Sequence, residues 1–191
     1  MDQEKALKLV KPHLNQTRYE HTKRVLKTAL ILADMYRVDR EDTMLAAIFH
    51  DYAKYRPLDE MITIIKDQNL STDLLSFHHE LWHGPVGSIL VEKELGIEKQ
   101  SIKDAIYWHT TGHGQMTDLE KIIYLADYIE PGRNFPGLNL IQKKAGENLN
   151  EACFMAVRNS MRFLVERERL IYPETLNMYN QLKRKLEESN S

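Results

Sequence analysis

Cysteine is nearly absent from this 191-residue chain, and glycine and proline are sparse, at eight and six residues. The single cysteine, Cys153, excludes an intramolecular disulfide and a cysteine-based zinc site, and it fits the reducing environment of the cytoplasm. The sequence also lacks any run of about 18 apolar residues, the length that a membrane-spanning helix needs. We therefore expect a cytoplasmic protein with no membrane partner.

An excess of charge of one sign is missing as well. The chain has 26 lysines and arginines against 28 aspartates and glutamates, which gives a formal net charge of -2. Proteins that bind DNA or RNA non-specifically carry a basic excess, so the composition disfavours a nucleic-acid partner. Hydrophobic residues make up 42% of the chain and charged residues 28%, as in ordinary globular domains.

Apolar residues recur at spacings of three and four through most of the chain, which predicts an all-α fold. The expected helices cover about residues 17–37, 40–51, 58–67, 71–79, 85–95, 101–109, 117–130, 140–168 and 173–188. The clearest loop is 134–139, which contains Pro136 and Gly137. We expect one domain over residues 1–191: a helical bundle with its core at about 17–133, and C-terminal helices at about 139–188 that pack on the core or extend it.

Polar side chains lie on apolar helix stripes at four positions, namely His21, Asp51, His109 and Asp127. A buried carboxylate or imidazole must be paired, hydrogen-bonded or bound to a metal, because an uncompensated buried charge costs several kcal/mol. One histidine on such a face is more often a satisfied core residue than a ligand. Such residues on several helices at once favour a metal site.

If these helices pack together, the chain can hold two cations bridged by Asp51. The first cation would be surrounded by His21, His50, Asp51 and Asp127, and the second by His83, His109 and Asp51. Neighbouring residues on a helix diverge by about 100°, so His50 can face one ion while Asp51 spans both. Imidazole with carboxylate suits iron, manganese, zinc, nickel or cobalt, whereas calcium and magnesium prefer shells of oxygen.

His21, the pair His50-Asp51 and Asp127 match the signature of the HD-domain metal-dependent phosphohydrolases, which the chain resembles. The segments that carry the likeness are RYEHTKRV at 18–25, AAIFHDYAK at 46–54, LWHGPVGS at 81–88, YWHTTGH at 107–113 and IIYLADYIEPGR at 122–133. Together they resemble the YqeK-type subfamily over essentially the whole chain. The resemblance implies a symmetrical bis(5'-nucleosyl)-tetraphosphatase, which splits diadenosine tetraphosphate into two ADP.

The resemblance also implies that His83 and His109 complete a site for two metal ions, with iron as the metal. In such a site a bridging water becomes hydroxide near neutral pH, and both cations stabilise charge on the phosphoryl oxygens. No side-chain nucleophile is then required. Cys153 lies in a late amphipathic helix, away from the histidines, where a buried small apolar residue is the expected interpretation.

Phosphate groups need positive charges beyond the metals. Lys54 lies three residues after Asp51, and the resemblance places a catalytic, phosphate-facing lysine there, although a solvated lysine would have the same pattern. Arg133 lies at a helix end, where it either contacts phosphate through two N–H groups or caps the helix. Arg18, within one turn of the first ligand histidine, either reaches the rim of the site or is solvated.

The loop after His109 offers further donors. The hydroxyl of Thr110 and the backbone N–H of Gly112 either bind phosphate or form a turn. His113, on the same loop, can donate to phosphate. Phe135 lies in the loop that we expect to be exposed, and its ring can stack on a base of the substrate.

Other functions remain open on the sequence. The same metal site could serve another nucleotide, as in a nucleotide phosphatase or a hydrolase of guanosine alarmones. A catalytically silent domain that binds nucleotide and metal is a further alternative, although the complete set of six ligands argues against it. A homodimer through the C-terminal helices is possible, and packing of those helices on their own domain would explain the same stripes.

Overall fold

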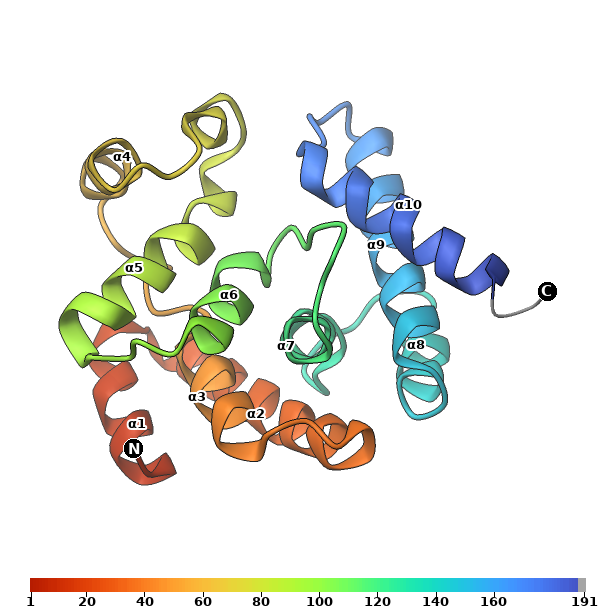
Figure 1. Cartoon of the computed structure of the whole chain (residues 1–191), viewed down its shortest axis with the longest axis horizontal. Helices are drawn as coiled ribbons and strands as arrows, with labels where there is room; N and C mark the ends of the chain where they lie inside the picture. Colours follow the sequence, from red (N-terminus) through yellow and green to blue (C-terminus); the bar gives the residue numbers. More distant parts are fainter. Residues whose placement is uncertain (189–191) are drawn as a thin grey trace.

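The computed structural model describes residues 1–188, and their secondary structure is helical without a strand. Ten α-helices follow one another (Figure 1): α1 Gln3–Val10, α2 Gln16–Tyr36, α3 Arg40–Phe49, α4 Leu58–Asp67, α5 His83–Leu95, α6 Gln100–Trp108, α7 Asp118–Ile129, α8 Leu138–Ala145, α9 Leu149–Glu166 and α10 Pro173–Glu188. The predicted all-α fold is confirmed. None of the helices in this part of the chain has the length and hydropathy to cross a membrane.

Short polar side chains set where the longer helices begin. Asn15 accepts a hydrogen bond from a backbone N–H of the first turn of α2, and Asp39 does the same for α3. Thr117 and Glu120 form a reciprocal capping box at the start of α7. These side chains satisfy N–H groups that have no partner within the helix.

Helix α7 is the central element of the bundle (Figure 1). Its buried face packs against α2, α3 and α6 on one side and against α8 and α9 on the other, and α10 lies on α9. Helix α5 packs on α6 at the opposite end from the C-terminal helices. Fully buried aliphatic side chains such as Ile106, Ile122 and Ile123 fill the space between these helices. The polar stripes of α2, α3, α5, α6 and α7 therefore meet in the interior.

Two predicted helices of the N-terminal two thirds differ from the structure. The range 71–79 holds a 3-10 helix, Thr72–Ser76, followed by a second one at His79–Leu81 instead of an α-helix. The His78 side chain accepts the Glu80 N–H and so competes with an i to i-4 helical bond at this point. Helix α5 begins at His83, two residues before the predicted start at Pro85, since proline fits the first turn of a helix.

The two ends of the chain also depart from the prediction. Helix α1 was missed, because its eight residues are too few for a clear apolar period. The single helix expected at about 140–168 is two helices, α8 and α9, separated at residues 146–148. Asn148 accepts the Glu151 N–H and starts α9 anew, so its capping bond replaces continuation of the helix.

Candidate metal centre

Helix ends bring the predicted ligands together. His50 and Asp51 directly follow α3, His109 directly follows α6, and His83 is the first residue of α5. His21 lies in the second turn of α2, and Asp127 lies in the last turn of α7. All except Asp127 are buried, and the Asp127 side chain is 19% exposed. Below, these six residues are called the central cluster.

Asp51 lies at the middle of the central cluster, and its two oxygens face different groups of side chains. Oδ2 is 2.9 Å from His50 Nε2 and 3.8 Å from His21 Nε2, whereas Oδ1 is 3.2 Å from His83 Nε2. His83 Nε2 is in turn 3.0 Å from His109 Nε2. The potential ligand atoms form two compact sets that share Asp51: His21 with His50 and Asp51, and Asp51 with His83 and His109.

Three of the four histidines of the central cluster, His21, His50 and His109, are oriented by hydrogen bonds at Nδ1. His50 Nδ1 donates to the Ala47 carbonyl and His109 Nδ1 to the Ile106 carbonyl, each at 2.7 Å. These bonds fix the tautomer and leave the Nε2 lone pair directed at the centre of the cluster. Histidine ligands of metals are held by this arrangement.

Glu130 does the same for His21, a role that its place in the sequence does not indicate. Its carboxylate accepts His21 Nδ1–H at 3.0 Å, the Arg24 guanidinium at 2.5 Å and the Gly132 N–H at 2.6 Å. His21 Nε2 is thereby left to face Asp127 Oδ1 at 3.0 Å. A glutamate before Pro-Gly indicates a helix end in sequence, and only its distance from His21 in space reveals this second role.

The polar atoms of the central cluster are not all satisfied within the protein. Five buried side-chain atoms in residues 1–188 have no hydrogen-bond partner, and three of them are His21 Nε2, His50 Nε2 and Asp51 Oδ1. Buried polar groups without partners are rare and costly in folded proteins. Two imidazole nitrogens and a carboxylate oxygen without hydrogen bonds in one buried cluster fit a site for metal ions, which accept their lone pairs.

The pKa shifts of Asp51 and His109 favour their ligand forms, whereas at His50 the Asp51 carboxylate outweighs burial and raises the pKa. Burial alone would raise the pKa of Asp51, but His50, His83 and Arg18 outweigh burial and hold that pKa well below its usual value. Burial, together with His83 and His50, lowers the pKa of His109 to about 3. An ionised Asp51 and a neutral His109 at neutral pH are the protonation states that metal binding requires.

Positively charged side chains surround the central cluster. Arg18 donates to Asp51 Oδ2, and Arg133 donates through Nη2 to Asp127 Oδ1 at 2.6 Å. Lys54 lies one turn after Asp51 but is paired with Glu80 in this structure. The three lysine and arginine side chains selected from the sequence as phosphate contacts therefore lie at or near the central cluster, and each is paired with an acidic side chain.

The remaining candidate phosphate contacts lie on the loop after α6, with Thr110 beside the central cluster and His113 away from it. The Thr110 hydroxyl lies 3.4 Å from His109 Nε2, at the edge of the central cluster. Gly112 adopts a positive φ of 63°, which permits the sharp turn toward α10. Beyond it, His113 Nε2 donates to the Glu120 carboxylate at 2.8 Å, and the His113 ring lies tilted against Trp108, with 4.7 Å between ring centroids.

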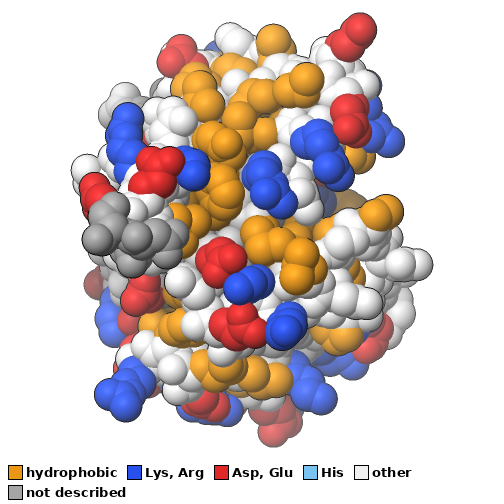
Figure 2. Space-filling model, turned by 90° about the vertical axis from the view of Figure 1, so that its right-hand side faces the viewer, with side chains coloured by type: hydrophobic (Ala, Val, Ile, Leu, Met, Phe, Trp, Pro, Cys, Tyr) orange, Lys and Arg blue, Asp and Glu red, His pale blue; other side chains and the backbone are white. Residues whose placement is uncertain are grey.

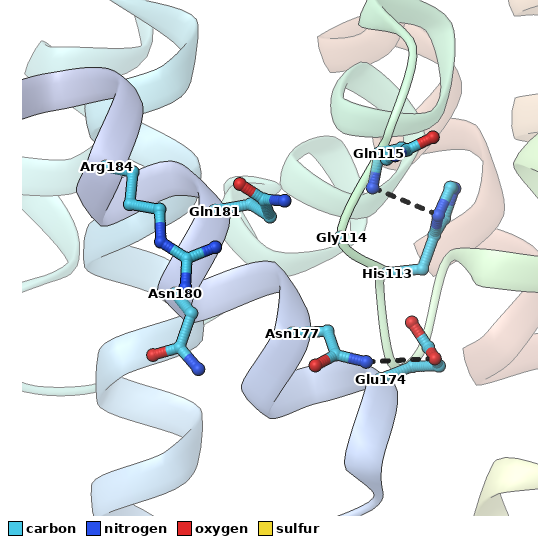
Figure 3. Close-up of a pocket in the computed structure, with 8 residues that line it drawn as sticks. All are labelled: His113, Gly114, Gln115, Glu174, Asn177, Asn180, Gln181 and Arg184. Carbon is cyan, nitrogen blue, oxygen red and sulfur yellow. Dashed lines mark hydrogen bonds between the residues drawn. The ribbon is translucent and has the colours of Figure 1, made fainter. Parts of the chain in front are cut away.

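His113 lines a different, polar pocket. Figure 3 shows it with Gly114 and Gln115 on the loop, opposite α10 side chains that include Asn177, Gln181 and Arg184. None of the residues that line this pocket belongs to the central cluster. Contact of His113 with substrate thus stays a prediction with no geometric support, whereas Phe135 lines a cavity that Asp127 of the central cluster also lines.

Comparison with known proteins agrees with this geometry. The family described as "HD domain" matches residues 18–132. A protein of Halalkalibacterium halodurans named "Bis(5'-nucleosyl)-tetraphosphatase, symmetrical" is 48% identical over 95% of this chain and 97% of its own length. A protein of Bacillus subtilis with the same name is 46% identical over 95% of this chain and 98% of its own length.

A solved structure shows the same fold. It is the crystal structure of a protein of Clostridium acetobutylicum described as a "predicted HD superfamily hydrolase involved in NAD metabolism", and it is 35% identical to this chain. The two align with a TM-score of 0.91 over 97% of this chain and 98% of the other. The chain belongs to the HD-domain family of metal-dependent hydrolases, together with its bacterial relatives named symmetrical bis(5'-nucleosyl)-tetraphosphatases.

Proposed function

We propose that this protein is a metal-dependent hydrolase that cleaves bis(5'-nucleosyl) tetraphosphates symmetrically. The observation that carries the proposal is the central cluster, with its three partnerless buried atoms, in a chain 48% identical over almost its full length to a relative named for this activity. The substrate of this type is diadenosine tetraphosphate. Water adds to one of the two inner phosphorus atoms, the P–O bond between the inner phosphates breaks, and two ADP leave.

We assign the metal ligands to the six residues of the central cluster. His21, His50, Asp51 and Asp127 would hold one ion, and Asp51, His83 and His109 would hold the other. Imidazole and carboxylate ligands suit iron, and also manganese, cobalt, nickel or zinc. Metal ions held there supply an activated water and neutralise negative charge on the phosphoryl oxygens.

The other residues position the substrate and the ligands. Lys54 and Arg133 bind phosphate oxygens, and both stabilise the charge that develops in the transition state. Lys54 leaves its ion pair with Glu80 when it binds the substrate. Arg18 reaches the same phosphates from α2. Glu130 keeps His21 in the orientation in which Nε2 faces the metal.

Product analysis tests the proposal directly. Metal-analysed protein is incubated with diadenosine tetraphosphate, with and without a chelator, and the nucleotides are separated by ion-exchange chromatography. Two ADP per substrate, abolished by chelation, is the expected result. ATP plus AMP would contradict symmetrical cleavage while keeping the metal-dependent hydrolase.

A substrate panel separates this proposal from its alternatives. Nucleoside triphosphates and guanosine alarmones are offered to the same metal-loaded protein, and kcat/KM is compared with that for diadenosine tetraphosphate. We expect the dinucleoside tetraphosphate to be preferred. No product from any of these compounds with metal-replete protein would instead support a catalytically silent binding domain.

A further inference from the structure

A cavity lies beside the central cluster, and the proposed hydrolysis at the metal ligands does not use it. It has a volume of about 620 Å³ and lies between the segment 133–136 and the C-terminal half of α9. Small-molecule sites have volumes of roughly 300–1,000 Å³, so the cavity has the size of a ligand site. Asp127, a member of the central cluster, forms part of its wall, and the cavity therefore adjoins the proposed reaction centre.

Aromatic rings form much of the wall of this cavity. Tyr128 and Phe135 line it with their rings in edge contact, and Phe163 lines it from α9. Phe163 is 51% exposed, and the Arg167 guanidinium lies over its ring at 3.9 Å from the centroid. Figure 2 shows apolar side chains gathered between charged ones on the side of the molecule that the C-terminal helices form. Open aromatic faces of this kind are what nucleobases stack on.

A polar edge interrupts the apolar wall. Asn159 and Ser160 line the cavity from α9, on the same wall as Tyr128. An amide and a hydroxyl offer a donor and acceptors to the edge of a base. A mostly apolar cavity with a few placed polar groups is the usual form of a site that selects its ligand.

The end of the cavity nearest the central cluster carries a phosphate-binding side chain. Arg133 uses Nε and Nη2 on the Asp127 backbone oxygen and carboxylate, and its Nη1 has no partner in the described part of the chain. The Arg133 side chain is 35% exposed and lines the cavity. A phosphate on Arg133 would place the nucleoside attached to it toward the rings.

We propose that this cavity binds one nucleobase of the dinucleoside polyphosphate, stacked against Phe135 and Phe163 and contacted at its edge by Asn159. The inference rests on the proposed function, and it makes that function more specific. Helix α9 lies outside the residues 18–132 that match the HD domain, so nucleoside recognition is added to the metal site by the C-terminal helices.

Equilibrium binding tests the proposal without relying on turnover. ADP and inorganic pyrophosphate are titrated calorimetrically into metal-loaded protein, because they share two linked phosphates and differ in the nucleoside. Loss of one stacked base contact corresponds to about tenfold weaker binding. We therefore expect Phe163→Ala to raise the Kd for ADP about tenfold and to leave the Kd for pyrophosphate unchanged.

The matched control is Val165→Ala, an exposed apolar residue of the same helix that does not line the cavity. It should leave both Kd values at those of the parent protein. An unchanged Kd for ADP in Phe163→Ala, an equal loss for ADP and pyrophosphate, or no ADP binding by the parent would each overturn the base site. Protein that shows the expected binding but does not split diadenosine tetraphosphate would contradict the proposed function alone.

A second variant tests the polar edge. Asn159→Ala should change the ratio of the Kd values for ADP and GDP, since these two ligands differ only in the groups at the edge of the base. The Kd for pyrophosphate should again stay constant. An unchanged ratio would overturn the assignment of Asn159 to the base edge.

Discussion

Amphipathic helices form both halves of the molecule, but their inward faces differ between the half with α2, α3, α5 and α6 and the half with α9. The inward residues at α2, α3, α5 and α6 include five buried ionisable side chains, those of His21, His50, Asp51, His83 and His109. The inward residues of α9 are apolar or small, among them Leu149, Ala152, Cys153, Ala156 and Val157. Apolar periodicity alone produces a packed helix in both halves, so it carries no information about chemistry. Polar residues at inward positions do, because burying them is costly.

The difference extends to the atoms left without partners. Of the five such buried atoms in the described residues, three lie in the central cluster, and one, Asn150 Oδ1, lies in α9. Asn150 Oδ1 is not grouped with other potential ligand atoms in the described residues, so it does not indicate a metal site. The comparison therefore predicts that changes in the first half alter metal binding and turnover, and that changes in the second alter stability alone or substrate affinity.

The largest effect is expected from Asp51→Ala, which removes the carboxylate shared by both ligand sets. Turnover of diadenosine tetraphosphate should fall by at least about 10³-fold, because both ions lose a ligand. Metal analysis of the purified variant should show reduced metal content. Asp67→Ala, at the exposed end of α4, is the control. An Asp51→Ala protein with full activity and both ions would contradict the shared-ligand assignment.

Lys54→Ala should separate metal binding from transition-state stabilisation. Metal content should equal that of the parent, while kcat should fall about 10²-fold, as is typical when one donor to developing charge is lost. Glu80→Gln, which removes the ion-pair partner, should not lower kcat. Steady-state constants of Lys54→Ala that match those of the parent would exclude a catalytic role for this lysine.

Glu130→Gln tests whether a residue that does not touch the metal orients one that does. A weaker acceptor for His21 Nδ1–H should lower metal affinity by about 10–100-fold, measured by titration of the metal-free protein. Glu20→Gln, a half-exposed glutamate on α2, should bind metal like the parent. Equal affinities of Glu130→Gln and the parent would restrict Glu130 to its contacts with Arg24 and Gly132.

Removal of metal should destabilise the protein through the central cluster. At a free metal concentration of 100 times Kd, binding adds about 2.7 kcal/mol to the free energy of unfolding. Urea unfolding with and without a chelator measures this difference. Asp51→Ala should show a much smaller response, and an equal response in both proteins would place the stabilising metal elsewhere.

The smallest effect is expected in the second half, at Cys153. Burial raises the pKa of its thiol to about 12, so the reactive thiolate is scarce at neutral pH and folded protein should resist iodoacetamide until it is unfolded. Cys153→Ala should lower the free energy of unfolding by about 1 kcal/mol through lost packing. Turnover and metal content should not change, and a large loss of either would give Cys153 a role that its position does not suggest.

Local signals in the sequence were sufficient where a physical rule acts over a few residues. The three-and-four apolar spacing identified α7 and most other helices. The apolar spacing gave a wrong prediction at 71–79, where one hydrogen bond to the His78 side chain favours 3-10 turns. It was wrong again at 146–148, where Asn148 starts a new helix. In both places a single capping interaction outweighed a pattern averaged over many residues.

The sequence by itself determined the all-α class, the inward polar residues of the central cluster and the resemblance that indicated their chemistry. Only the tertiary structure decided that Glu130 holds His21, 109 residues away in the chain, and that Phe163 of α9 lies in one cavity with Arg133. His113 shows the converse, since adjacency to a ligand in sequence did not bring it into the cluster. The physical reason is that periodicity records which face of a helix is buried, whereas the partner of that face depends on how helices pack.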